Sequence, residues 1–63
     1  MFWVIRFNGS IHAWIANPER GYAFRTVFEE RFAHRFPSGE DARDEMLRLG
    51  LSTRWSAVQL EAQ

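Results

Sequence analysis

The chain contains no cysteine, no lysine and no long apolar segment. Without cysteine it forms neither disulfides nor a thiolate metal site, and small secreted domains usually depend on disulfides. The longest apolar run near the start, residues 2–5, ends at Arg6. It is much shorter than a membrane span or the apolar region of a signal peptide. We therefore expect a cytoplasmic protein with no membrane segment.

Net charge is absent as well, because eight arginines balance eight acidic residues. A protein that follows a nucleic-acid backbone normally has a basic surplus. The lack of lysine has two explanations. One is a GC-rich genome, and the other is the suitability of the planar guanidinium group for contacts with carboxylates at an interface.

The sequence has no arrangement of residues that is typical of catalysis or metal binding. His12 and His34 are the only histidines, and a zinc site needs three or four protein ligands. None of the four serines lies in a nucleophile elbow, and Glu29 and Glu30 are adjacent rather than opposed across a cleft. The glycines punctuate turns and caps and form no phosphate-binding loop. We expect no enzymatic activity, no cofactor and no metal.

Aromatic residues, by contrast, are abundant: there are ten of them among 63 residues. A chain of this length forms a single domain, residues 1–63, near the lower limit of independent folding. Its core has room for about five or six large rings, because the surface of so small a domain is large relative to its volume. The other rings must cover the surface, pair with a second copy or contact a partner.

Residues 2–16 are predicted to form a β-hairpin, because two runs of aromatic and branched residues flank Asn8-Gly9. A two-residue turn would place His12 and Trp14 on the same face as Trp3 and Ile5. A loop of odd length gives one wholly apolar face instead, and we favour it. The apolar face then consists of Trp3, Ile5, Phe7, Ile11, Ala13 and Ile15. The opposite face consists of Phe2, Val4, Arg6, His12 and Trp14.

Residues 22–36 follow a turn at 17–21 and fit two patterns. Tyr22, Phe24, Thr26 and Phe28 alternate as in a strand. Phe24, Phe28, Phe32 and Phe36 recur at the four-residue spacing of an amphipathic helix. Enrichment in Tyr, Phe, Thr and Val favours a strand over 22–28. Residues 29–36 are then an irregular or short helical connection.

An α-helix is predicted over residues 39–49, because Ser38 can cap its start and Gly50 can close its end. One stripe of the helix is apolar. It consists of Ala42, Met46 and Leu49.

On the helix surface Asp44 and Arg48 can pair at i,i+4. A last strand is predicted over residues 54–60, in which either alternating set of side chains could face the core. The predicted fold is therefore α+β: an antiparallel sheet of three to four strands, with one helix packed on one face.

The second face of the hairpin is not a normal solvated surface, since hydrophobic rings surround Arg6 and His12 there. Either another part of the fold or a second subunit covers it, or it binds a partner, for which Trp and Arg are favoured anchors. A homodimer through this face is compatible with either class of partner, protein or nucleic acid. The candidate partner-binding residues are Phe2, Arg6, His12, Trp14, Arg25 and Trp55.

Nucleic acid is the alternative partner, because arginines interleaved with aromatic residues can neutralise phosphates and stack bases. Glutamates lie among these arginines and reduce the local surplus of positive charge to one. The alternative function is binding of RNA or single-stranded DNA. Its candidate residues are Arg20, Tyr22, Arg25, Arg31 and Arg35.

The segment from Arg31 to Ala42, followed by Leu49-Gly50-Leu51 and a final strand, resembles the helix entry of many small phage and prophage accessory proteins. The resemblance covers about a third of the chain and carries no functional residues. Some such proteins, including anti-CRISPR and other anti-defence proteins, block a larger host complex by protein contact. The resemblance therefore implies a small protein-binding inhibitor or regulator in the host cytoplasm. The neutral charge argues against mimicry of nucleic acid.

Overall fold

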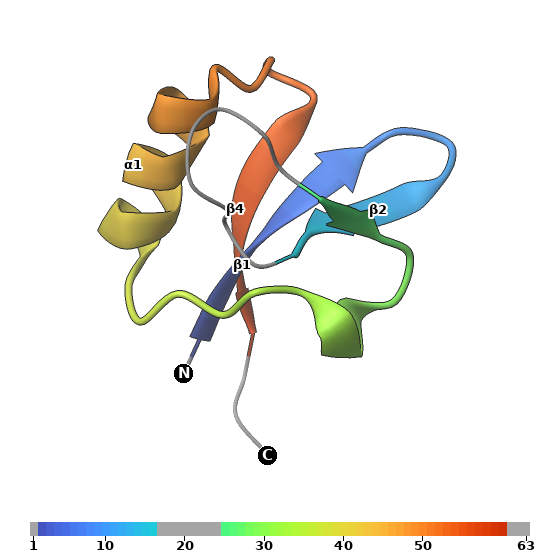
Figure 1. Cartoon of the computed structure of the whole chain (residues 1–63), viewed down its shortest axis with the longest axis horizontal. Coiled ribbons are helices and arrows are strands. Elements are labelled where there is room, and N and C mark those ends of the chain that lie inside the picture. The colour runs from blue at the N-terminus through green and yellow to red at the C-terminus, as the bar shows by residue number, and fades with distance from the viewer. Residues whose placement is uncertain (1, 17–24, 61–63) are drawn as a thin grey trace.

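The computed structural model describes residues 2–16 and 25–60. These residues form a four-stranded antiparallel sheet in the order β3-β2-β1-β4, and one α-helix packs on one face (Figure 1). This confirms the predicted α+β fold. The elements are β1 (Phe2–Asn8), β2 (His12–Ile15), β3 (Thr26–Val27), the 3-10 helix η1 (Glu30–Phe32), α1 (Gly39–Leu49) and β4 (Trp55–Leu60).

The hairpin of β1 and β2 has the predicted odd-length loop. Asn8 pairs with His12, which leaves three residues, Gly9-Ser10-Ile11, in the loop. The strand residues therefore divide between the two faces as expected. Ile11 is an exception: it is an exposed loop residue and does not belong to the apolar face. Side chains alternate between the two faces only while the backbone is extended, so the alternation does not place Ile11 in the loop.

Asn8 and Gly9 do not act as the two central residues of a tight turn. Asn8 is the last residue of β1, and its side-chain amide donates to Ser56 Oγ on β4 at 2.9 Å. Gly9 leaves space for a neighbouring ring, because a Cβ there would lie 2.3 Å from Cε2 of Phe7. The Asn-Gly pair thus predicts the position of the hairpin loop correctly, although the two residues do not form the tight turn that this pair usually forms.

The helix α1 has the predicted bounds and caps. Ser38 Oγ accepts a hydrogen bond from the backbone N–H of Asp41 at 3.1 Å. At the other end Gly50 adopts the left-handed conformation (φ 66°), and its N–H donates to the carbonyl of Leu47. An L-residue with a side chain avoids this conformation, so glycine closes the helix.

The ion pair on α1 differs in one partner from the one that the spacing allowed. Arg48 pairs with Glu45, not with Asp44: its Nη2 donates to Glu45 Oε2 at 3.0 Å, and its Nε donates to Oε1. Spacings of three and four residues both bring helical side chains together. Only 11 % of the Glu45 side chain is exposed, and a shielded carboxylate with two donors makes the stronger pair.

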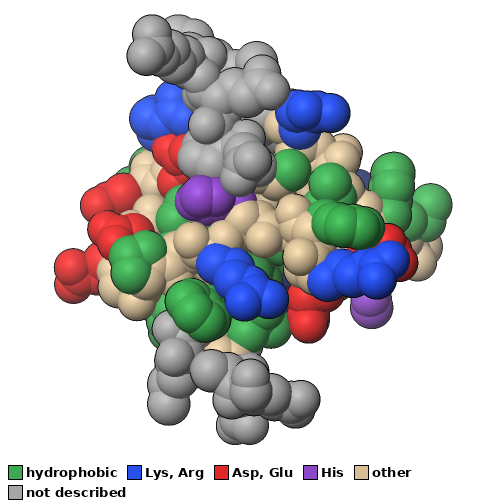
Figure 2. All heavy atoms as spheres, turned by 60° about the horizontal axis from the view of Figure 1, so that its bottom comes forward, with side chains coloured by type: hydrophobic (Ala, Val, Ile, Leu, Met, Phe, Trp, Pro, Cys, Tyr) green, Lys and Arg blue, Asp and Glu red, His purple; other side chains and the backbone are tan. Residues whose placement is uncertain are grey.

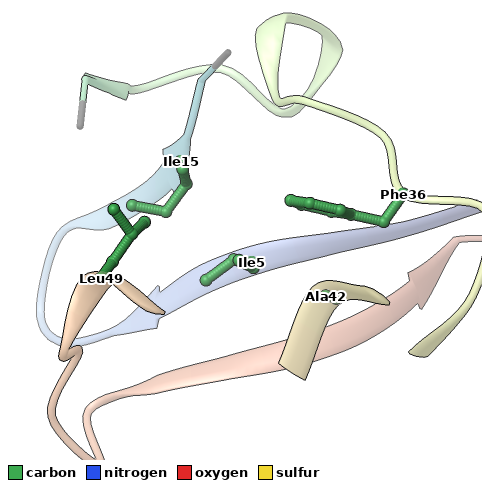
Figure 3. Packing of buried hydrophobic residues seen from close by; sticks show 5 residues of the cluster. All are labelled: Ile5, Ile15, Phe36, Ala42 and Leu49. Carbon is green, nitrogen blue, oxygen red and sulfur yellow. The ribbon is translucent and has the colours of Figure 1, made fainter. Parts of the chain in front are cut away.

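The first core lies between α1 and the sheet (Figure 3). Ala42 and Leu49 of the predicted helix stripe are buried there, and Met46 packs against them. The five buried residues of this cluster come from both strands of the hairpin, the connection before α1, and α1 itself. They are Ile5, Ile15, Phe36, Ala42 and Leu49.

The second core lies on the opposite face of the sheet, where the connection between β3 and α1 covers part of it. Ala33 of this connection is buried against Val4 and Trp14, and Val27, Val58 and Leu60 pack around them. Coverage by another part of the fold therefore accounts for the centre of the second hairpin face. Both alternating sets of β4 side chains pack in a core, because Ala57 belongs to the first core and Val58 to the second.

The connection is fixed to the sheet by backbone hydrogen bonds. The N–H of His34 donates to the carbonyl of Ile15 at 3.0 Å, and Phe36 forms an antiparallel bridge with Trp3. Residues 29–36 are thus a short helical and irregular connection, as predicted.

The strand expected over 22–28 is observed at Thr26–Val27. Residues 22–24 and the turn predicted at 17–21 lie outside the described residues. Over the described ranges 2–16 and 25–60, no helix has the length and apolar character needed to cross a membrane.

Candidate functional site

The structure divides the six predicted partner-binding residues between the two faces of the sheet. The register of β1 and β2 places Phe2, Arg6, His12 and Trp14 on the second face, as expected. Trp55 instead packs against the first core, beside Phe7, with 5.1 Å between ring centroids. Arg25 is exposed just before β3. Trp55 therefore does not extend the surface of the other five.

Trp14 is buried, so its ring does not face a partner. It packs with Val4 and Ala33 in the second core, and His12 contacts it edge-on at 6.3 Å between ring centroids. The expectation that Trp14 anchors a partner is corrected here, because Ala33 comes close enough to cover the indole. His12 is exposed and Arg6 half-buried at the margin of this core.

Exposed aromatic residues lie on the connection instead. Phe28 is 70 % exposed and Phe32 56 % exposed. The guanidinium of Arg31 lies over the ring of Phe32, 4.8 Å from its centroid. That of Arg35 lies over the ring of Phe2, 5.2 Å from its centroid. We call Phe2, Phe28, Arg31, Phe32 and Arg35 the basic–aromatic surface.

Local backbone geometry explains why these side chains point outwards. The 3-10 turn is closed by the N–H of Ala33, which donates to the carbonyl of Glu30 at 3.0 Å. Ala33 and Phe36 are buried and hold the connection against the sheet. Arg35 between them, and Phe28, Arg31 and Phe32 before them, are then left exposed. Figure 2 shows this side of the molecule, where blue arginine side chains lie beside green hydrophobic ones.

The two arginines of the surface differ in their ion pairs. Arg31 pairs with Glu29 at 3.3 Å, but both side chains are exposed and solvent screens the pair. Among the residues that the structure describes, Arg35 has no acidic side chain within ion-pair distance. The surface therefore presents exposed rings together with one cation that is not neutralised by the described part of the chain.

The structure describes only some of the residues that are predicted to bind nucleic acid. Arg31 and Arg35 belong to the basic–aromatic surface, and Arg25 is exposed before β3. Arg20 and Tyr22 lie outside the described residues. The structure thus brings Arg31 and Arg35 next to rings, and those rings belong to Phe32 and Phe2.

A second feature, a hollow of about 470 Å³, lies at the C-terminal end of α1. Its walls are mainly apolar, and Leu47 at its rim is 80 % exposed. The sequence pattern did not predict this site. The available signal was Leu47 itself, an apolar residue outside the helix stripe. The lining residues are Arg43, Met46, Leu47, Leu51, Ser52, Thr53 and Trp55.

No protein-family model, curated protein or solved structure matches this chain. Within residues 2–16 and 25–60, histidine, aspartate and glutamate side chains form no group of three that could hold a metal ion. The interpretation of both surfaces therefore depends on the side chains that form them.

Proposed function

We propose that the protein is a small protein-binding module whose basic–aromatic surface contacts a protein partner. The observation that carries this proposal is the exposure of Phe28 and Phe32 on a connection that is itself fixed to the sheet. Burying one phenylalanine side chain is worth about 1.5–3 kcal/mol. A partner that covers both rings gains this free energy without having to order a loose segment.

The arginines give the surface its specificity. Aromatic residues and arginine are enriched at the centres of protein interfaces, where they supply most of the binding free energy. A guanidinium that lies over a ring still has in-plane donors, so Arg35 can contact a carboxylate of a partner. Arg31 can do the same by exchanging its solvent-screened pair with Glu29 for the partner's carboxylate. The matching partner surface is an apolar depression bordered by acidic side chains.

Such contact suits an inhibitor or regulator that blocks a larger host complex by occupying its surface, as the resemblance to phage accessory proteins implies. It needs no catalytic group, no cofactor and no nucleic-acid mimicry. The proposed site of action is the cytoplasm, or the host cytoplasm for a phage-encoded protein, which agrees with the absence of cysteine. A homodimer through the same surface is the competing protein contact.

Affinity capture with a double variant tests the proposal. Phe28→Ser with Phe32→Ser removes the two exposed rings, and Ile11→Ser is a matched control, because Ile11 is 65 % exposed on the hairpin loop. We expect the double variant to fold and to lose the captured partner, while the control retains it. Capture that is equal for the native chain and the double variant would contradict the proposal. Sedimentation of the same variants measures any homodimer.

Binding of RNA or single-stranded DNA is the second candidate function, favoured by the two guanidinium groups next to rings. Phosphate contacts make affinity fall steeply as salt rises, and bases stack on aromatic side chains. Titration with mixed oligonucleotides at low and high salt measures this. Arg31→Gln with Arg35→Gln is expected to abolish such binding, and no binding at low salt would exclude this function.

A further inference from the structure

We infer that the hollow at the end of α1 is a second docking site, for a peptide segment of a partner protein that carries an apolar side chain next to a carboxylate. The site does not depend on the function proposed above, because it lies on the other face of the sheet. Its floor is formed by side chains that pack on the first core, whereas the basic–aromatic surface lies over the second.

The floor of the hollow is preformed and apolar. Met46, Leu51 and Trp55 are only partly buried, yet each packs against the buried residues of the first core. They therefore hold their positions without a ligand and leave one side accessible. The volume of about 470 Å³ falls within the range of pockets that bind small ligands or single anchoring side chains. Its lining favours an aliphatic or aromatic group.

Arg43 at the rim of the hollow is a cation that favours a ligand with a carboxylate next to its apolar side chain. Arg43 lies one helical turn before Leu47, so the two side chains share a side of α1. In the part of the chain that the structure describes, Arg43 has no carboxylate within ion-pair distance, unlike Arg48, which pairs with Glu45. A carboxylate that approaches the hollow therefore meets a guanidinium with its donors available. Charge complementarity thus favours a ligand that is both apolar and acidic.

Two hydroxyl side chains in the lining favour a peptide as the ligand that carries the apolar side chain and the carboxylate. Ser52 and Thr53 form part of the lining and are exposed. The Oγ of Ser52 accepts a hydrogen bond from the N–H of Arg54 at 3.4 Å and can still donate to a C=O group, whereas the hydroxyl of Thr53 suits either an N–H or a C=O group of a bound backbone. An apolar anchor in the hollow, a carboxylate on Arg43 and a backbone along Ser52 and Thr53 make one consistent arrangement.

Selection from a random peptide library displayed on particles tests the inference. The native chain is the target, and Leu47→Glu, an exposed substitution that introduces repulsion for acidic ligands, is the counter-target. Ile11→Glu is the matched control for an added charge on an exposed aliphatic residue. We expect enriched peptides in which an apolar residue is followed or preceded closely by Asp or Glu. They should bind Ile11→Glu like the native chain and bind Leu47→Glu at least tenfold more weakly.

A double-mutant cycle then locates the carboxylate. Replacing the acidic residue of an enriched peptide by its amide should weaken binding about tenfold, equivalent to about 1.4 kcal/mol. Arg43→Gln should cause a similar loss, and the two changes together should cost little more than either one. Additive losses would overturn the assignment of Arg43.

Three results would overturn the site itself. One is that no peptide is enriched on the native chain over Leu47→Glu. Another is that enriched peptides lose binding in the Phe28→Ser, Phe32→Ser variant, which leaves the hollow intact and tests the function proposed above. The third is a concentration-dependent dimer that Leu47→Glu converts to a monomer, which would make the hollow an interface between two copies of this chain.

Discussion

At the scale of single residues, Trp14 combines burial with an unsatisfied donor. Its Nε1 is buried and has no hydrogen-bond partner among the residues that the structure describes. An unsatisfied buried donor costs about 1–3 kcal/mol. Trp14→Phe removes the N–H but keeps an aromatic ring, so the lost packing is offset in part.

We expect Trp14→Phe to lower the free energy of unfolding by less than about 1 kcal/mol, and Trp14→Ala by about 3–5 kcal/mol. Urea denaturation followed by circular dichroism measures both. If Trp14→Phe costs as much as Trp14→Ala, the indole N–H stabilises the native state and the interpretation fails.

Glu45 is the second residue with a definite energetic role. Its hydrogen bonds with Arg48 lower the pKa of its carboxyl, with further contributions from the charges of Arg48 and His34, while burial opposes them. A carboxyl whose pKa is lower in the folded state than in the unfolded state stabilises the fold once it is ionised. This contribution is complete above the ordinary glutamate pKa and disappears as the pH falls through the lowered value.

Glu45→Gln is therefore expected to destabilise the protein at neutral pH, and the difference from the native chain should vanish in acid. Unfolding by urea at a series of pH values checks this. Asp44→Asn is the matched control, because Arg48 does not pair with Asp44. An effect of Glu45→Gln that is the same at all pH values would show that the ion pair is not its cause.

At the scale of elements, the end of α1 depends on the left-handed conformation of Gly50. Gly50→Ala should cost about 1 kcal/mol, because a Cβ disfavours this conformation. Gly50→Asn should cost less, since asparagine tolerates it. The midpoints of urea unfolding give both values.

Gly9 provides the contrast, since its backbone is not left-handed but a Cβ would collide with Phe7. Asparagine should therefore be no better than alanine at position 9. Equal costs of alanine and asparagine at position 50 would contradict the assigned cap.

The elements also show what sequence could and could not predict. Ser38 and Gly50 determine the ends of α1 through contacts within a few residues, so its bounds followed from the sequence. The odd number of residues in the hairpin loop followed from the alternation of apolar residues over β1 and β2. The burial of Trp14 did not, because it depends on Ala33, which is distant in sequence. The hollow was missed for another reason: its lining is local, within residues 43–55, but its shape depends on how Met46, Leu51 and Trp55 pack against the first core.

At the scale of the whole molecule, β1 joins the two cores. Val4 and Ile5 are adjacent and fully buried, yet they belong to different clusters on opposite faces of the sheet. Neither core is large enough to fold without the other, since a domain of this size is near the limit of stability.

Val4→Ala and Ile5→Ala should therefore each shift one common unfolding transition, with a cost of about 2–5 kcal/mol for the isoleucine and less for the valine. Hydrogen exchange at the backbone amides of α1 follows the first core, and exchange at the amides of Ala33 and His34 in the connection follows the second. If Val4→Ala left the protection of α1 unchanged while that of the connection fell, the two cores would be independent units.

The pairing of β1 with β4 has a consequence for biosynthesis. The second and the sixtieth residues are partners in this ladder, so the centre of the sheet stays incomplete until residues as far as Leu60 have left the ribosome. Until then Val4 and Ile5 have no strand on one side, and apolar side chains that the folded domain buries stay accessible. Formation of this domain must accordingly follow, and cannot accompany, translation of its sequence.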